Sequence, residues 1–558
     1  MKIALCQLNP IVGDLAGNVD LLLRDARRAA AEGARLAVFP ELCLTGYPPM
    51  DLLDRPQFIH DVENAVDRIA QEAPEGLALI IGAPTVNETP TGKRLYNSAL
   101  VIDGGEVRDT VSKTLLPTYD VFDEYRYFEP CDERRVVEID GFRLGLHICE
   151  DMWNNEEQAP YHLYRANPID ELAALGIDLF VNISASPYCV GKPEERAEII
   201  AESCREHGVP FVYVNTVGAN TELIFDGDSR VHGADGSELL RLGLWTEGVA
   251  VWDFAAPGSA QMPREVDPIA EIHDALVLGI RDYVRKTGDG VFEKALIGLS
   301  GGIDSAVTCA LAAEALGPDR IVGVTMPSAY SSSGSVDDSR LLADALGIEF
   351  HDVSIRPAVD AFAQMLTPVF EGPPEGIAEE NIQSRARGLT LMAISNAQGH
   401  LLLTTGNKSE MAVGYATLYG DMSGGLAVLS DVFKQEVYAL AHEVNRRAGR
   451  EIVPQNTITK PPSAELKPGQ VDSDSLPPYD VLDAILERYI EHHASVEAIV
   501  DAGFERATVE RIVRLVDRNE YKRRQAAPGL RVSPKAFGIG RRLPIVMRRT
   551  RVAPEVTA

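Results

Sequence analysis

The stretch Leu296-Ile-Gly-Leu-Ser-Gly-Gly-Ile-Asp-Ser305 decides the fold of the second half of the chain. An apolar run leads into paired glycines, and Asp304 then opens an Ala-rich segment that is typical of a helix. This order predicts a strand, a tight turn and a helix N-terminus, where backbone amides and the helix dipole favour an anion. The glycines let the backbone approach a phosphate, and the serine hydroxyls add donors. The stretch therefore predicts a nucleotide site, and a turn without a ligand is the alternative.

The phosphate turn, residues 298–305, lacks the lysine that follows the glycines of a Walker loop, which argues against ordinary γ-phosphate transfer. Its pattern, Ser-Gly-Gly-x-Asp-Ser, resembles the loop of the ATP pyrophosphatases, which adenylate a carboxylate or carbonyl oxygen and expel pyrophosphate. The resemblance implies that ATP is bound by the whole turn, namely Gly298, Leu299, Ser300, Gly301, Gly302, Ile303, Asp304 and Ser305.

Strand and helix patterns alternate around the phosphate turn and predict a doubly wound parallel sheet. We expect strands at residues 295–299, 321–326, 350–353 and 401–405, and helices at residues 269–286, 304–316, 335–346 and 381–397. Two polar segments, residues 371–379 and 460–478, are expected to be long loops that a ligand orders.

The first half mixes strand pairs with helices and predicts an α/β sandwich. We expect strands at residues 2–8, 36–39, 77–81, 98–102, 143–148, 179–183 and 210–215, and helices at residues 18–31, 57–71 and 193–207. Asn18 is expected to cap the first of these helices. Pro, Gly and Ala without periodicity then mark a linker, so we predict domains at residues 1–252 and 271–558 with the linker at residues 253–270.

The length of the chain indicates how many domains it contains, and its charge argues against some classes of binding partner. A chain of 558 residues with 45% hydrophobic content exceeds one ordinary core, and two or three domains are expected. Its formal charge of −30 argues against a general nucleic-acid or acidic-membrane binder. The tail from Tyr521 to Ala558 is the exception, with ten Lys or Arg against Glu555 alone. This basic tail either covers an anionic ligand or is simply solvated.

The cysteines indicate a reducing compartment. They are seven in number, contain no Cys-x-x-Cys pair and lie in apolar contexts, which is typical of reduced cytoplasmic thiols. Neither a leader pattern nor a window of about 18 uninterrupted apolar residues is present, so we expect a cytoplasmic protein without a membrane span.

Three polar residues stand at the ends of apolar runs in the first half, where a sandwich would present them to one pocket. Glu41 follows Val38-Phe39-Pro40, Lys113 precedes Leu115-Leu116-Pro117, and Cys149 ends the run from residue 144. A thiol needs a base to become a nucleophile, and an ammonium stabilises both the thiolate and the oxyanion formed on attack at an amide. Taken singly, each would be an ordinary core or surface residue; together they predict amide hydrolysis.

This set resembles the nitrilase superfamily in its three motifs, Phe39-Pro40-Glu41-Leu42, Lys113-Thr114-Leu115-Leu116-Pro117 and His147-Ile148-Cys149-Glu150-Asp151. The resemblance implies an αββα sandwich in which Cys149 is the nucleophile, Glu41 the general base and Lys113 the electrostatic partner. Glu124 matches a second glutamate found beside the triad. Other positions match those that hold glutamine in glutamine-hydrolysing members, namely Tyr119, Ser186 and Lys192, with Glu150, Trp153 and Tyr188 as pocket walls.

The second half resembles the ammonia-accepting NAD synthetases, and the whole chain resembles the glutamine-dependent NAD synthetases. The shared motifs are the phosphate turn, Met326-Pro327-Ser328, Asn381-Ile382-Gln383-Ser384-Arg385, Thr404-Thr405-Gly406-Asn407-Lys408-Ser409-Glu410 and Lys460-Pro461-Pro462-Ser463-Ala464-Glu465-Leu466. The family converts deamido-NAD, ATP and glutamine to NAD, AMP, pyrophosphate and glutamate, and its members are homo-oligomers.

That resemblance assigns the remaining ligand contacts. It implies that Thr405 binds ATP, that Asn381, Glu410 and Lys522 bind deamido-NAD, and that Asp304 and Glu410 hold Mg²⁺, although Glu410 would then serve metal or dinucleotide. Lys434 and Asp421 are weaker candidates. Because Lys522 lies in the basic tail, its assignment favours a tail that covers an anionic ligand over one that is simply solvated.

Other functions stay open on the sequence. A guanylate- or asparagine-forming ligase would use the same phosphate turn, but such enzymes carry other glutaminase domains. A nonenzymatic nucleotide sensor would not need the reactive set in the first half. A free amidase with a regulatory nucleotide module is the third possibility.

Overall fold

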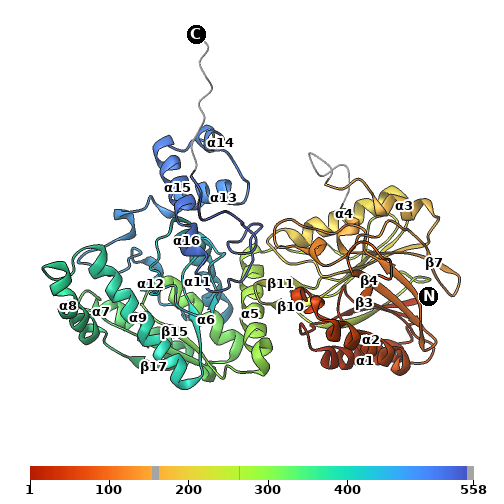
Figure 1. Cartoon of the computed structure of the whole chain (residues 1–558), viewed down its shortest axis with the longest axis horizontal. Helices are drawn as coiled ribbons and strands as arrows, with labels where there is room; N and C mark the ends of the chain where they lie inside the picture. The colour runs from red at the N-terminus through yellow and green to blue at the C-terminus, as the bar shows by residue number, and fades with distance from the viewer. Residues whose placement is uncertain (154–162, 263, 549–558) are drawn as a thin grey trace, which may run out of the picture. The chain divides into compact units, whose positions relative to one another are not determined.

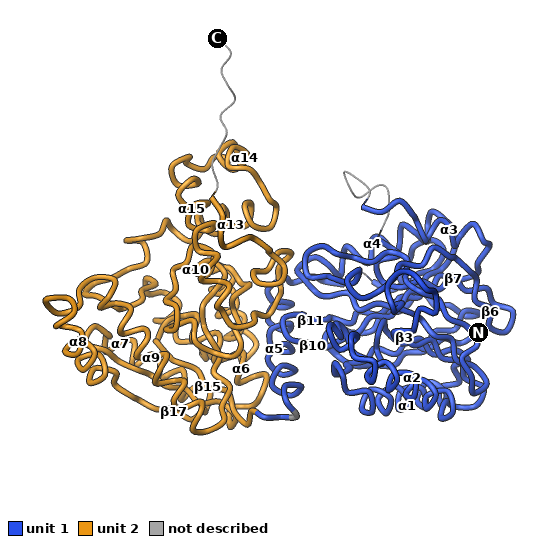
Figure 2. Tube along the Cα trace, viewed as in Figure 1, with its two compact units in different colours: residues 1–291 blue, residues 292–558 orange. Residues whose placement is uncertain are grey.

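The computed structural model describes residues 1–153, 163–262 and 264–548. The chain forms two compact units, Met1–Val291 and Phe292–Ala558, coloured separately in Figure 2. Each unit has its own sheets and cores, in agreement with the expectation of more than one domain. In the described residues, no helix combines the length and the apolar character needed to cross a membrane.

The first unit contains two six-stranded sheets and a short two-stranded ribbon (Figure 1). The first sheet has the order β14–β1–β2–β3–β4–β5, with strands β1 Lys2–Gln7, β2 Leu36–Val38, β3 Ala78–Val86, β4 Leu95–Asp103, β5 Glu106–Ser112 and β14 Gly248–Asp253. The second has the order β13–β12–β9–β8–β7–β6, with strands β6 Val137–Ile139, β7 Phe142–Ile148, β8 Leu179–Ser184, β9 Phe211–Asn215, β12 Arg230–His232 and β13 Glu238–Arg241. The ribbon pairs β10 Val217–Asn220 with β11 Leu223–Asp226.

Three apolar layers hold the first unit together. Buried side chains of both sheets, such as Val38 and Ile148, form one core between them. A second core packs α1 (Leu15–Ala31) and α2 (Pro56–Glu72) on the first sheet, and a third packs α3 (Pro168–Ala174) and α4 (Lys192–His207) on the second. This order of helix, sheet, sheet and helix confirms the predicted αββα sandwich.

The first helix begins earlier than predicted. The side chain of Asp14, not of Asn18, caps α1 by accepting a hydrogen bond from the Gly17 amide at 2.9 Å. Asn18 is buried inside the helix, where its amide bonds the backbone of Ile11 and of Leu44 at 2.8–3.0 Å. The prediction of the cap was wrong because the Asn18 side chain bonds the backbone of two loops, at Ile11 and Leu44, instead of the first amides of the helix.

The last helix of the first unit is α5 (Pro268–Lys286). β14 ends at Asp253, so the described residues between β14 and α5 contain no regular element. The Lys286 ammonium secures the C-terminal end of α5 through hydrogen bonds to Asn9 Oδ1 at 2.6 Å and to Asn220 Oδ1 at 3.0 Å.

The second unit is built on five parallel strands in the order β17–β16–β15–β18–β19. Their bounds are β15 Ala295–Gly298, β16 Ile321–Thr325, β17 Glu349–Asp352, β18 Leu401–Thr404 and β19 Leu426–Ala427. The strand order reverses beside β15, because the chain returns to place β18 on the other edge of that strand. A doubly wound sheet binds ligands at the carboxyl ends of its strands beside such a reversal.

Eleven helices of the second unit lie in its described residues. They are α6 Ile303–Leu316, α7 Ser333–Leu346, α8 Arg356–Phe370, α9 Ile377–Gln398, α10 Lys408–Val413, α11 Lys434–Ala448, α12 Gln455–Thr459, α13 Tyr479–Ile490, α14 Val496–Asp501, α15 Arg506–Arg518 and α16 Glu520–Arg523. α13, α14 and α15 share a separate core around Leu486, Ile499 and Ile512. The loop expected at residues 371–379 is shorter in the structure, because α8 ends at Phe370 and α9 begins at Ile377.

Two candidate active sites

Glu41, Lys113 and Glu124 form one buried cluster in the first unit. Glu41 lies beyond β2, Lys113 directly follows β5, and Glu124 opens a short 3₁₀ turn. The Lys113 ammonium donates to Glu41 Oε1 at 2.7 Å and to the two carboxylate oxygens of Glu124 at 2.8 and 2.9 Å. The Ala185 amide donates to Glu41 Oε2 at 2.8 Å. Two of the three predicted catalytic residues are thus in direct contact.

Cys149 stands on a sharp turn at the end of β7. It begins a 3₁₀ turn, Cys149–Met152, with a φ of +44°, a conformation that side chains other than glycine rarely adopt. The Asp151 carboxylate holds this turn by accepting from the Ile148 amide at 3.0 Å. Asp151 also accepts from the amides of Thr114 and Leu115 at 3.0 and 2.8 Å. One buried carboxylate therefore fixes the turn of Cys149 to the segment that carries Lys113.

Burial and the neighbouring charges set the protonation of this site. Burial, reinforced by Glu41, raises the pKa of the Cys149 thiol well above its ordinary value, although Lys113 opposes the shift. Burial lowers the pKa of Lys113, but Glu124 and Glu41 outweigh it and the net pKa lies well above the ordinary value. Burial raises the pKa of Glu124 to about 7 against the effect of Lys113. The resting site thus holds a neutral thiol, an ammonium and a carboxylate able to accept a proton.

Two of the predicted glutamine contacts, Tyr119 and Lys192, lie beside the turn of Cys149. The Tyr119 hydroxyl donates to Glu150, the residue after Cys149, at 2.9 Å. The Lys192 ammonium lies over the Trp153 ring, 3.6 Å from its centroid. The backbone amide of Ser186 donates to Asn215 Oδ1 at 2.9 Å.

Two buried residues of this site were missed by sequence reasoning. They are Asp151 and Asn97, whose side-chain amide donates to Glu41 Oε1 at 2.7 Å. Asn97 is a polar residue that precedes the apolar run Ala99–Ile102 of β4, and this is the available signal, which Ser98 shares. Asp151 lies within the quoted His147–Asp151 motif, but nothing local assigns it a role, because two of its backbone partners, Thr114 and Leu115, come from a distant segment.

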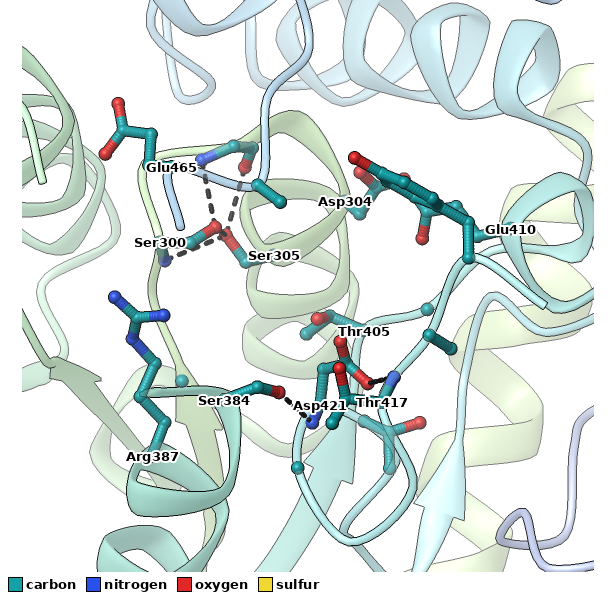
Figure 3. A pocket seen from close by; sticks show the side chains of 18 of the residues that line it. Ser300, Asp304, Ser305, Ser384, Arg387, Thr405, Glu410, Thr417, Asp421 and Glu465 are labelled. Atoms are coloured by element: carbon teal, nitrogen blue, oxygen red, sulfur yellow. Dashed lines mark hydrogen bonds between the residues drawn. The ribbon is translucent and has the colours of Figure 1, made fainter. Parts of the chain in front are cut away.

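The second site is a cavity of about 600 Å³ in the second unit (Figure 3). All residues of the phosphate turn except Gly301 line it, together with Asn381, Thr405, Glu410 and Lys522. Residues 460–466 of the predicted long loop also line it. The fold therefore brings the predicted ATP and deamido-NAD residues to one cavity.

The phosphate turn owes its shape to Gly301. Its φ is +74°, and a Cβ atom there would lie 2.4 Å from the Ser335 carbonyl oxygen. The Ser300 amide donates to Ser305 Oγ at 3.3 Å, and the Gly302 amide donates to Ser300 Oγ at 3.2 Å. α6 begins directly after Gly302, so the turn sits at the N-terminus of a 14-residue helix, where an anion is favoured.

Asp304 and Glu410 share the ammonium of Lys434 at one side of the cavity. Lys434 Nζ donates to Asp304 Oδ2 and, at 3.2 Å, to Glu410 Oε1. Asn407 donates to Asp304 Oδ1 at 2.8 Å. Burial and Asp304 raise the pKa of Glu410 to about 8 against the effect of Lys434. Two carboxylates at the cavity are the hard oxygen donors that suit Mg²⁺.

The other predicted ligand residues lie around α9 and the start of the basic tail. Thr417 Oγ1 donates to Asn381 Oδ1 at 2.9 Å. The Thr417 amide donates to Asp421 at 2.7 Å (Figure 3). The Lys522 ammonium donates to the carbonyls of Gly414 and Ala416 at 2.7 Å. The start of the tail is thus folded onto the cavity, whereas residues 549–558 lie outside the described part of the chain.

Sequence reasoning missed Arg387, which lies on α9 and lines the cavity (Figure 3). Its Nε donates to the Met326 carbonyl at 3.2 Å, and burial lowers its pKa. An arginine two positions beyond the quoted Asn-Ile-Gln-Ser-Arg motif was the available signal.

Known proteins resemble the chain over both units. Residues 2–264 match the family model for carbon-nitrogen hydrolase, and residues 272–526 match that for NAD synthase. The chain is 46% identical over 551 residues to a glutamine-dependent NAD(+) synthetase of Synechocystis sp., which covers 97% of this chain and 98% of that protein. A protein of the same name from Acinetobacter baylyi is 43% identical, with 98% of each chain covered.

A solved structure extends the likeness to three dimensions. The glutamine-dependent NAD+ synthetase from Acinetobacter baumannii in complex with adenosine diphosphate has a TM-score of 0.77, with 39% identity and 98% of each chain covered. Because sequence and fold agree over nearly the full length, the chain belongs to the glutamine-dependent NAD(+) synthetase family.

Proposed function

We propose that this protein hydrolyses glutamine in its first domain and uses the ammonia to amidate deamido-NAD in its second, with ATP as the activating substrate. The observation that carries this proposal is the pairing in one chain of two ionic clusters, Glu41–Lys113–Glu124 beside Cys149 and Asp304–Lys434–Glu410 at the phosphate turn. We assign residues 1–252 to glutamine hydrolysis, residues 253–270 to the linker, and residues 271–558 to NAD synthesis.

In the first domain, Glu41 acts as the base. It takes the proton of the Cys149 thiol, which burial keeps protonated at rest, and the thiolate attacks the amide carbon of glutamine. The Lys113 ammonium stabilises the oxyanion. Glu41 returns its proton to the amide nitrogen, ammonia leaves, and water then hydrolyses the thioester to release glutamate and the free thiol. Tyr119, Ser186 and Lys192 hold the glutamine.

In the second domain, the phosphate turn and Thr405 hold ATP, and Asn381, Glu410 and Lys522 hold deamido-NAD. The nicotinate carboxylate attacks the α-phosphorus of ATP and pyrophosphate leaves. Ammonia then attacks the acyl carbon and AMP leaves. Asp304 and Glu410 would hold Mg²⁺, which neutralises charge on the phosphates of ATP when bound.

The same two carboxylates are paired with Lys434. Asp304 and Glu410 together raise the pKa of Lys434 against its burial, so this side chain is an ammonium. The site thus keeps a cation beside the position of the phosphates, which supports the assignment of polyanionic substrates to this cavity.

We further propose that the protein works in the cytoplasm as a homo-oligomer. None of the seven cysteines, all of which lie in the described residues, forms a disulfide, as expected in a reducing compartment. α8 has no buried residue, and the side chains of Met365, Val369 and Phe370 are exposed by 61%, 71% and 50%. An apolar helix face of this kind on a soluble chain favours contact with a second copy.

The proposed reaction is tested by following the amide nitrogen. Purified protein is mixed with deamido-NAD, Mg-ATP and glutamine labelled with ¹⁵N at the amide. We expect ¹⁵N-labelled NAD and one AMP for each NAD. Glutamate and labelled ammonia without NAD or AMP would instead favour a free amidase with a regulatory nucleotide module.

A further inference from the structure

Asn97 joins the three ionic residues of the first site. This residue of β4 is only 1% exposed. Its Nδ2 donates to Glu41 Oε1 at 2.7 Å and, with a longer bond of 3.4 Å, to Glu124 Oε2. Its backbone carbonyl accepts from the Lys113 amide at 2.8 Å. One residue therefore contacts the proposed base, the second glutamate and the backbone of the lysine.

The two carboxylates that accept from the side-chain amide of Asn97 fix its orientation. The two carboxylates repel a carbonyl oxygen, so the NH₂ group must face them. The Oδ1 atom on the other side is buried and has no hydrogen-bond partner among the described residues. Leaving an acceptor unpaired in a buried site is unfavourable. The contact with the carboxylates therefore determines why an asparagine occupies this position.

We infer that Asn97 is a positioning residue for glutamine hydrolysis, whose side-chain amide holds Glu41 in the ionised, correctly aimed form of a general base. The inference rests on the function proposed above. Two carboxylates here share the single ammonium of Lys113, and a neutral donor stabilises both without adding charge. A second ammonium would compete with Lys113 for the two carboxylates, and an acceptor would repel Glu41.

Four charged or titratable side chains surround Glu41 in the described residues. They are Lys113, which keeps its two contacts, Glu124, Cys149 and Tyr47, whose hydroxyl donates to Glu124 Oε1 at 2.8 Å. Without Asn97 the carboxylates lose a donor, and both bind a proton more readily. The base is then protonated at a higher pH, so activity falls on the acid side.

The test is the pH profile of glutamate release by the full-length protein, supplied with deamido-NAD, Mg-ATP and glutamine. Leucine has a similar volume to asparagine but no donor. In Asn97→Leu we expect the acid limb, the part of the profile in which the rate falls with decreasing pH, to move up by about one pH unit. On that limb the variant is then about tenfold slower than the unaltered protein. We expect recovery at alkaline pH and an unchanged KM for glutamine. Asn97→Ala leaves room for a water that donates in place of the amide, so its acid limb moves less.

Several controls separate this role from a structural one. The backbone contact of residue 97 with Lys113 survives both substitutions, so the register of the strand is kept. Asn87→Leu removes a comparably buried asparagine of the same hairpin that bonds only backbone and Thr89, and its acid limb should not move. NAD formation from ammonium, measured in each variant, shows whether the second domain is intact.

The outcomes are distinct. A displaced acid limb in Asn97→Leu, with Asn87→Leu unchanged, supports the inference. A loss that is equal at every pH, or a larger loss in Asn97→Ala than in Asn97→Leu, overturns it, because those results follow from packing alone. Cys149→Ala, measured in parallel, separates failure of the proposed function from failure of the role of Asn97. Continued glutamate release in Cys149→Ala contradicts the proposed function itself. If Cys149→Ala releases no glutamate and the pH profile of Asn97→Leu is unchanged, only the role of Asn97 is contradicted.

Discussion

At the scale of single residues, His147 shows how burial beside the nucleophile affects stability. Its ring lies edge-on to Phe180 and Phe211, and burial lowers its pKa from 6.5 to about 4. The unfolded chain therefore binds a proton between pH 6.5 and 4 that the folded chain does not. The contribution of neutral His147 to stability is present above pH 6.5 and is lost as the pH falls toward 4, by about 3 kcal/mol in total.

The chain offers a selective probe of this effect. All three tryptophans, Trp153, Trp245 and Trp252, lie in the first unit, so their fluorescence follows the unfolding of that unit. We predict that His147→Phe flattens the rise of the unfolding free energy between pH 4 and 6.5, measured in urea. His60→Phe, at a histidine whose side chain is 63% exposed, is the control and should keep the slope. Equal slopes in both variants would contradict the assignment.

At the scale of elements, the phosphate turn depends on one backbone contact. We predict that Gly301→Ala abolishes NAD formation from glutamine and from ammonium, because the added Cβ would collide with the backbone of Ser335. Gly347→Ala is a matched control, since its φ of +72° is nearly the same but no atom lies within 4 Å of the added Cβ. The control should lose about 1 kcal/mol of stability and keep its activity.

This pair of variants is judged by steady-state rates with both nitrogen donors and by thermal unfolding. If Gly301→Ala keeps normal turnover with either donor, the phosphate turn is not the ATP site. If both variants lose activity equally, backbone strain and not the contact with Ser335 controls the turn.

The elements nearest the phosphate turn were predictable because their signals are local. The apolar run, the glycines and the helix opening at Ile303 are contiguous, and the strands around them follow a simple alternation. The helix α8 and the helices α10–α16 were not predicted. α10 packs on α13 and α15, and α11 and α12 pack on α6, which are elements distant in sequence, whereas α8 contacts α9 and contains no buried residue.

The same distinction holds for the sites. Residues Glu41, Lys113 and Cys149 could be named because each stands at the end of an apolar run. The contacts that organise them could not, because Asn97 and Asp151 act across different strands. In the second unit, no local pattern indicates that one lysine of α11 reaches two carboxylates, 24 and 130 positions away in the sequence.

At the scale of the whole molecule, the exposed face of α8 predicts self-association. We expect the double substitution Met365→Lys and Val369→Glu to lower the molar mass measured by light scattering during size exclusion, because it places charges in an apolar contact. Gln364→Glu, at an exposed polar position of the same helix, should leave the mass unchanged. A mass that is the same in all three proteins would rule out this face as the contact.

The central claim is that one chain carries two separable reactions joined by ammonia. Each ionic cluster is complete within its own unit, so loss of one site should spare the chemistry of the other. Asp304→Ala is expected to stop NAD formation from glutamine and from ammonium alike, since it removes a partner of Lys434 and a proposed metal ligand. Normal turnover in that variant would remove the basis of the phosphate-site assignment.

The most direct test is the rate of NAD formation by Cys149→Ala, measured with deamido-NAD, Mg-ATP and either glutamine or ammonium. The account predicts that synthesis from glutamine falls below about one thousandth of that of the unaltered protein, as expected for loss of a nucleophile, while synthesis from ammonium continues within about twofold. Loss of both reactions in a folded protein, or undiminished synthesis from glutamine, would contradict it.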